Sequence, residues 1–113
     1  MKIVLAMAKI QIHNLFCKTI DVDNTGRTLL QHFHDNALDW MHACGGKGRC
    51  TTCKVIVLNG IENLEPLTPA EVRYINLKAL KSNERLSCQA KVTGDVIVRA
   101  PSEYKLPHVK YSE

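Results

Sequence analysis

The chain has 113 residues, 45% of them hydrophobic, and a formal net charge of +4. This size suits one domain with a modest core, and no apolar run approaches the roughly 20 residues of a membrane-spanning helix. The 15 lysine and arginine residues are scattered rather than clustered, which argues against a nucleic-acid-binding protein.

A β-hairpin is predicted near the N-terminus. Residues 8–13 alternate apolar with polar side chains, the pattern of a half-buried strand. Ile20 and Val22 continue the alternation in a second short strand, and Asn14 marks the turn between the two strands. The segment 24–26 (Asn-Thr-Gly) predicts a further turn that leads out of the hairpin.

The next segment predicts a helix from Thr28 to about Asn36. Its apolar residues recur at helical spacing and are expected to face the core: Leu29, Leu30, Phe33 and Ala37. A loop rich in cysteine and glycine follows. After that loop, residues 54–58 (KVIVL) are apolar on both faces, which predicts an internal strand that ends at Asn59-Gly60.

A second helix is predicted from three agreeing signals. Thr68 is suited to cap it, Pro69 to occupy the first helical position, and Glu71 to complete a capping box. This helix is expected to reach about Leu80.

The last third of the chain predicts two short strands and a tail. The strands are expected at 88–92 and 96–98, joined by a turn at 93–95, and the tail from Pro101 is expected to be a surface strap or disordered. A hairpin, a helix and further strands indicate an α+β fold. We expect one domain over residues 1–113, with its core at about 8–101.

Five cysteines limit the choice of chemistry: Cys17, Cys44, Cys50, Cys53 and Cys88. The N-terminal MKIVLAMAKI does not have the pattern of a signal peptide, so a cytoplasmic protein is expected. Disulfides are rare in that compartment and the number of cysteines is odd, which favours metal binding or catalysis.

The spacing of the cysteines favours an iron–sulfur cluster. Three lie in the stretch 44–53, CGGKGRCTTC, and Cys88 stands alone much later in the chain. A structural zinc site usually takes its ligands as two close pairs. A Rieske centre needs two Cys/His pairs, and this sequence has only one candidate pair, His42 with the cysteine of the loop that follows it. A thiol redox pair would use Cys50 and Cys53 alone. The three-plus-one division fits a [2Fe–2S] cluster bound by four thiolates.

Glycines in the loop have a physical reason if a cluster is bound. A [2Fe–2S] cluster with four thiolates carries a net charge of about −2, and about −3 when reduced. Burial of this charge is costly unless N–H groups point at the sulfur atoms. Gly45, Gly46 and Gly48 would let the backbone wrap closely enough for that purpose.

These features resemble the [2Fe–2S] ferredoxins of the Cys-x5-Cys-x2-Cys kind, which include adrenodoxin-like and bacterial iron–sulfur-assembly ferredoxins. The resemblance runs from about Lys9 to Pro101 and rests on four segments: TLLQHFHDNAL, HACGGKGRCTTC, LTPAEV and RLSCQAKV. It implies a β-grasp fold and one [2Fe–2S] cluster, with one iron bound by Cys44 and Cys50 and the other by Cys53 and Cys88.

The same resemblance implies a function. We expect a soluble, monomeric one-electron carrier that receives an electron from a reductase and passes it to an acceptor enzyme. It is not expected to be an enzyme itself. Two alternatives stay open: an iron–sulfur or zinc-bearing structural subunit of a larger complex, and a thiol oxidoreductase that uses Cys50 and Cys53. Colour separates the electron carrier from a zinc-bearing subunit, because a [2Fe–2S] protein is red-brown and a zinc protein is colourless.

The sequence departs from this family in its charges. Adrenodoxin-like members usually carry an acidic second helix, whereas here Glu71 is its only acid, beside Arg73 and Lys78. Lys54 follows the third cysteine of the loop, where histidine is frequent, and Arg49 stands where a small residue is usual. We therefore expect docking to prefer an acidic partner surface.

Several other residues are expected to be structural or solvated. Cys17 is interpreted as a buried or half-buried thiol in a strand region, Trp40 as packing on the core or against the loop, and His42 as a structural or surface residue. Solvated positions are expected for His32, His34, Lys47, Arg49 and Lys54.

Overall fold

The computed structural model describes residues 8–22, 27–38, 40, 53–102, 106–107 and 109–112. The predicted turn at 24–26 and most of the cysteine-rich loop, with Cys44 and Cys50, lie outside these residues. The same is true of His42, Lys47 and Arg49. Within the described residues, no helix has the length and apolar character needed to cross a membrane.

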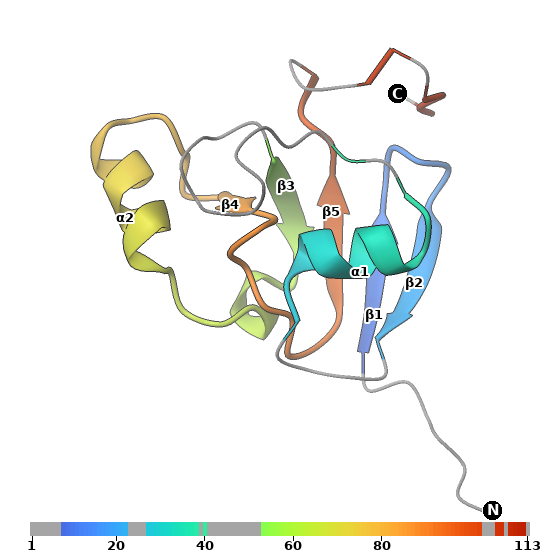
Figure 1. Ribbon diagram of the computed structural model, residues 1–113, viewed down its shortest axis with the longest axis horizontal. Coiled ribbons are helices and arrows are strands. Elements are labelled where there is room, and N and C mark those ends of the chain that lie inside the picture. The colour runs from blue at the N-terminus through green and yellow to red at the C-terminus, as the bar shows by residue number, and fades with distance from the viewer. Residues whose placement is uncertain are drawn as a thin grey trace, which may run out of the picture.

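The described residues form a mixed five-stranded sheet with two helices (Figure 1). Its strand order is β2-β1-β5-β3-β4, in which β1 runs parallel to β5 and the other neighbours are antiparallel. The strands are β1 (Ala8–Ile12), β2 (Lys18–Val22), β3 (Lys54–Asn59), β4 (Glu84–Leu86) and β5 (Val96–Arg99). The α+β class predicted from the order of elements is therefore confirmed.

The helices occupy different places. Helix α1 (Leu29–Asp35) lies across one face of the sheet, whereas α2 (Pro69–Asn76) lies beyond the β4 edge (Figure 1). A single 3-10 turn, η1 (Ile61–Asn63), follows β3. Both helices begin with the capping box that places a threonine at the N-cap, Thr28 and Thr68 respectively.

Alternation along β1 places one set of side chains in the core. Ile10 and Ile12 are fully buried, and Leu29 and Phe33 of α1 cover them from the helix side. The expected inward position of Ala37 is wrong, because this residue lies beyond the end of α1 and is exposed. Its φ of 57° ends the helix, and the Leu38 N–H donates to the Phe33 carbonyl in a Schellman-type termination.

Helix α2 is shorter than the sequence predicts and ends at Asn76 rather than near Leu80. Lys78 adopts a φ of 60°, which turns the chain out of the helix. The Ala79 N–H then donates to the Tyr74 carbonyl at 2.8 Å, which completes a second Schellman-type termination. The prediction was too long because apolar residues continue beyond Asn76 and nothing in their spacing indicates a turn. Leu80 is buried, but it lies after the turn and not in the helix.

The fourth strand lies earlier in the chain than predicted. It spans Glu84–Leu86 and pairs with the start of β3, whereas the predicted strand at 88–92 contains only isolated bridges. The sequence did not indicate this strand because its first two residues, Glu84 and Arg85, are charged types that are typical of a surface loop. Both are nevertheless buried, and Cys88 falls in the turn that follows the strand.

The β1–β2 connection corrects the interpretation of Cys17. This residue is exposed and lies in a turn, where it has a φ of 54°. The predicted turn residue Asn14 is fully buried, and its side chain makes two hydrogen bonds of 2.9 Å with the backbone of Ala100. The turn thus joins the hairpin to the end of β5.

Candidate metal centre

Two of the four predicted ligands face each other in the described structure. The Sγ atoms of Cys53 and Cys88 lie 3.4 Å apart, and both residues are buried and free of disulfide bonds. They flank the same end of the antiparallel β3–β4 pair, Cys53 just before β3 and Cys88 two residues after β4, although they are 35 positions apart in sequence. Cys44 and Cys50 lie outside the described residues, so their predicted role stays a prediction.

Cys53 occupies the turn that leads into β3, and its backbone is fixed from two sides. Its carbonyl oxygen accepts hydrogen bonds of 3.2 Å from the Trp40 indole Nε1–H and from the Ser87 N–H. The Trp40 ring in turn packs on Phe33 of α1, with ring centroids 4.5 Å apart. Trp40 is buried, so its expected packing on the core is confirmed.

The turn that carries Cys88 is held by the N-terminus of α1. Leu29 and Leu30 donate their N–H groups, both at 2.9 Å, to the carbonyls of Ala90 and Ser87 respectively. The first N–H groups of a helix have no partner within the helix, so they are available for such bonds. The helix end and the capping box therefore position the Cys88 turn against the sheet.

Two polar side chains beside Cys88 are hydrogen-bond donors of the kind that an iron–sulfur cluster needs. The Gln89 side-chain Nε2 lies 3.7 Å from the Cys88 Sγ. The Ser87 hydroxyl is buried and has no hydrogen-bond partner within the described part of the chain. A buried hydroxyl without a partner is costly, and a sulfide or thiolate would accept its hydrogen bond. Sequence reasoning missed Ser87, because serine before a cysteine is not distinctive by itself.

Lys54 differs from its expected role as a solvated charge. It is buried beside Cys53, and its Nζ lies 3.4 Å from the Glu84 Oε2. The Glu84 Oε1 also accepts a hydrogen bond of 2.8 Å from the Lys81 N–H. The β3–β4 pairing brings this lysine and glutamate together. The cation that directly follows a candidate ligand is therefore paired with a carboxylate inside the protein.

Glu71 is a structural residue rather than a surface acid of α2. Its carboxylate is fully buried and accepts hydrogen bonds from Arg85 Nε at 2.6 Å and Arg85 Nη2 at 2.9 Å. It also accepts from the Leu86 N–H at 3.0 Å and from the Thr68 N–H at 3.1 Å. One carboxylate thus joins the start of α2 to β4, two residues before Cys88.

His32 also differs from the sequence expectation, because it is only 4% exposed, whereas His34 is exposed. The two residues are on different faces of α1, as their spacing predicts. Neither is near enough in the chain to make a Cys/His ligand pair with Cys53 or Cys88.

Comparison with known proteins gives the family. The model for the 2Fe-2S iron-sulfur cluster binding domain matches residues 16–93, more than half of the chain. The chain is 36% identical over 98 residues to "2Fe-2S ferredoxin-5" of Aquifex aeolicus, covering 84% of this chain and 100% of that protein. It is 33% identical over 88 residues to a 2Fe-2S ferredoxin of Escherichia coli, covering 77% of this chain and 79% of that one.

Solved structures give the same result. The ISC-like [2Fe-2S] ferredoxin FdxB of Pseudomonas putida matches with a TM-score of 0.73 and 31% identity, covering 91% of this chain and 99% of that one. Reduced putidaredoxin of Pseudomonas putida matches with a TM-score of 0.65 and 25% identity, covering 84% and 97%. The expected β-grasp fold is thereby confirmed. The chain belongs to the [2Fe–2S] ferredoxin family, whose members carry single electrons between proteins on one iron–sulfur cluster.

Proposed function

We propose that Cys44, Cys50, Cys53 and Cys88 bind the single [2Fe–2S] cluster through which this ferredoxin carries electrons. The separation of 3.4 Å between the sulfurs of Cys53 and Cys88 is the observation that supports this assignment. A disulfide would hold the sulfurs at about 2.05 Å. Two thiolates on one tetrahedral metal, with bonds of about 2.3 Å, lie roughly 3.8 Å apart. The observed separation is much closer to the metal-bound value.

The chain itself would supply shielding and hydrogen bonds. When bound, the cluster takes up one electron and its negative charge increases. The buried Ser87 hydroxyl would donate a hydrogen bond to a sulfur atom, and the buried rings of Trp40 and Phe33 would shield the Cys53 side from water. Donors that point at sulfur stabilise the reduced form more than the oxidised form, since the reduced form carries more charge.

We further propose a monomer in the cytoplasm, with residues 8–101 as the folded core of one domain. The protein partners of such a carrier are a reductase that supplies the electron and an acceptor enzyme that consumes it. The exposed free thiol of Cys17 favours a reducing compartment.

The ligand assignment is tested by serine substitution. Cys44→Ser, Cys50→Ser, Cys53→Ser and Cys88→Ser should each abolish or strongly destabilise the cluster, because metal binding and folding are coupled. Cys17→Ser is the matched control and should keep the visible spectrum, because the Cys17 thiol is exposed in the β1–β2 turn.

Measurements of iron, sulfide and zinc on the purified protein separate the outcomes. About two irons and two sulfides per chain, a red-brown colour and bleaching by dithionite would support the proposal. A colourless protein with one zinc would point to a structural subunit instead. A Cys17→Ser protein that loses colour while Cys88→Ser keeps it would overturn the ligand set.

A further inference from the structure

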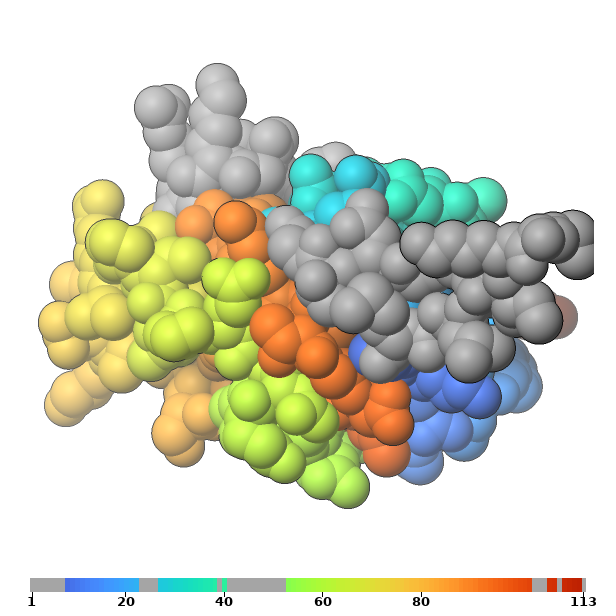
Figure 2. Space-filling view, turned by 90° about the horizontal axis from the view of Figure 1, so that it is seen from below, coloured from blue at the N-terminus to red at the C-terminus, as the bar shows by residue number. Residues whose placement is uncertain are grey.

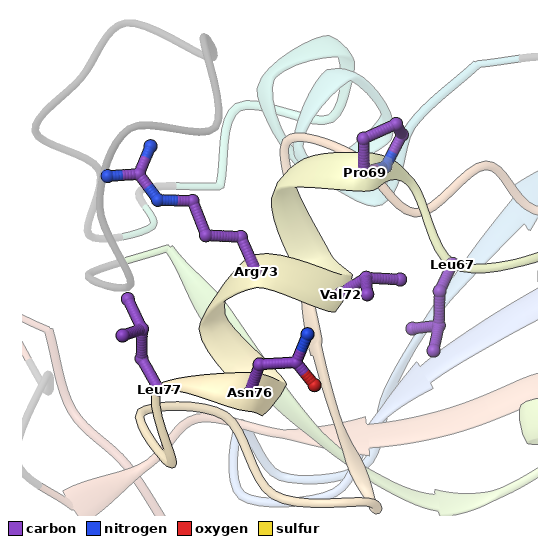
Figure 3. Close-up of a pocket in the computed structure, with 6 residues that line it drawn as sticks. All are labelled: Leu67, Pro69, Val72, Arg73, Asn76 and Leu77. Carbon is purple, nitrogen blue, oxygen red and sulfur yellow. The ribbon is translucent and has the colours of Figure 1, made fainter.

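Helix α2 presents an apolar face to solvent. Five of its outward residues follow the spacing i, i+3, i+4, i+7 and i+8, which is one face of a helix. Together with Leu67 they line an open groove of about 660 Å³: Pro69, Val72, Arg73, Asn76 and Leu77 (Figure 3). The side chains of Leu67, Val72 and Leu77 are 43%, 42% and 63% exposed. A solvated helix would carry polar residues at such positions.

The groove lies on a fixed support. The inner face of α2 is held by the buried Glu71–Arg85 pair and by Tyr74 and Ile75, which pack against the core. Figure 2 shows that the segment containing α2 (yellow) forms one end of the molecule. The apolar face is therefore rigid and prominent, which are properties of a docking surface.

The exposed charges of the segment that carries the groove, residues 66–83, have one sign. Between residues 66 and 83 the only acid is Glu71, which is buried and paired with Arg85. Three bases of the same segment are exposed: Arg73, Lys78 and Lys81. Arg73 lies in the groove itself, and in Figure 3 its guanidinium extends away from the helix axis. The surface is thus an apolar groove with a basic rim.

We propose that this surface docks a redox partner whose contact face carries an apolar side chain surrounded by carboxylates. The proposal rests on the proposed electron-carrier function and adds the chemistry of the partner. Opposite charges would steer the encounter, and the apolar side chain would fill the groove between Leu67, Val72 and Leu77. A second copy of this chain does not suit the groove in a two-fold contact, because the same bases would face each other.

The position of the groove suits electron transfer. Glu71 joins α2 to Leu86, and Cys88 follows two residues later in the same segment. A partner bound on α2 would therefore lie at the β4 side of the candidate metal centre. Electron-transfer encounters are short-lived and use small interfaces, below about 1,200 Å². One groove and its basic rim are enough for such an interface.

Two haem proteins of opposite charge serve as probes. Cytochrome b5 has carboxylates around its haem edge, and mitochondrial cytochrome c has lysines there. The second-order rate of oxidation of the reduced holo-protein by each probe is measured by stopped flow, over a range of ionic strength. With cytochrome b5 we expect a rate that falls as salt increases, and about a tenfold decrease in Arg73→Glu or Lys78→Glu. The matched control is Lys18→Glu, the same charge change at the start of β2 on the opposite edge of the sheet, which should change the rate less than twofold.

The apolar part of the groove is tested separately. Val72→Ser with Leu77→Ser removes exposed side chains and should keep the cluster spectrum while it slows the reaction with cytochrome b5 several-fold. Carbodiimide coupling, followed by mass spectrometry, should join carboxylates of cytochrome b5 to Lys78 and Lys81 in preference to Lys18. A preference for cytochrome c would overturn the proposal, as would equal effects of Arg73→Glu and Lys18→Glu.

Other outcomes separate this proposal from the function on which it rests. A holo-protein that reduces cytochrome b5 equally fast in all variants would overturn the docking site and leave electron transfer standing. A holo-protein with an intact cluster that reduces neither probe would overturn the proposed function and the docking site with it. Dimers in sedimentation that dissociate in Leu77→Ser would show that the groove contacts a second copy instead.

Discussion

At the scale of single residues, the buried carboxylate of Glu71 has the clearest structural role. It accepts four hydrogen bonds, two of them from the Arg85 guanidinium, and no part of it is exposed. Loss of one partner of a buried ion pair leaves the other charge unpaired in a medium of low polarity. The buried Arg85 guanidinium is therefore tolerated because the Glu71 carboxylate lies at hydrogen-bonding distance.

Glu71→Gln is expected to lower the free energy of unfolding by about 3–5 kcal/mol. The matched control is Asp35→Asn, which removes the acid of the Arg27–Asp35 pair, where the two side chains are 36% and 53% exposed. This exposed pair should contribute no more than about 1 kcal/mol. Urea unfolding of both holo-proteins, followed by circular dichroism, gives the comparison. Equal shifts of the two midpoints would contradict the prediction.

At the scale of secondary-structure elements, several chain reversals require a positive φ, and those after α1 and after β3 are opposite cases. The reversal after α1 places a non-glycine residue, Ala37, at a φ of 57°. The reversal after β3 places Gly60 at a φ of 84°, where an added Cβ would collide with the Asp95 carbonyl oxygen. The first position carries a conformational cost that glycine would remove, and the second position accepts only glycine.

Ala37→Gly is expected to stabilise the protein by about 0.5–1 kcal/mol. The left-handed conformation costs an L-residue about 1–2 kcal/mol, and the greater freedom of glycine in the unfolded chain offsets part of that gain. Gly60→Ala is the opposite test and should destabilise by more than about 1 kcal/mol. Thermal unfolding of the two variants should therefore shift the midpoint in opposite directions. A lower midpoint for Ala37→Gly would show that the helix end does not hold this conformation in solution.

At the scale of the whole molecule, the C-terminal tail closes the end of the sheet. The Ser112 N–H donates to the Asn14 carbonyl at 3.0 Å, and the Ser112 Oγ accepts from the Phe16 N–H at 3.1 Å. Val109 and Tyr111 are half-buried against the core. The expectation of a surface strap is therefore confirmed for residues 109–112.

Removal of residues 106–113 is expected to destabilise the fold by about 1–3 kcal/mol, through the loss of three hydrogen bonds between Ser112 and the β1–β2 turn and through newly exposed apolar surface. Hydrogen exchange at the Phe16 amide should become faster, because its partner is removed. Ser112→Ala removes the hydroxyl that accepts from the Phe16 N–H and donates to the His13 carbonyl, and it keeps the apolar contacts. It should therefore accelerate exchange at Phe16 with a smaller loss of stability than the truncation. Unchanged exchange in the truncated protein would mean that the tail is detached in solution.

Features that depend on neighbours in the chain can be predicted from the amino-acid sequence alone. The capping box at Thr68 was predicted correctly because both of its partners lie within one helical turn, whereas the helix after Thr28 was predicted from its apolar spacing and its capping box appeared only in the structure. The crowding of three cysteines with glycines indicated an iron–sulfur cluster for a similar reason, since its chemistry is carried by one short loop and one later cysteine.

Which charged and polar groups lie inside the protein depends on packing between distant segments. Glu71, Lys54 and His32 are residue types usually found at the surface, yet each is buried by residues from another part of the chain. The partner of Glu71 is 14 positions away on β4, and the β3–β4 pairing brings Lys54 to Glu84. No local pattern encodes such pairs. Burial of a charge is favourable only where the fold supplies an opposite charge at hydrogen-bonding distance, and that condition is set by packing across the sheet.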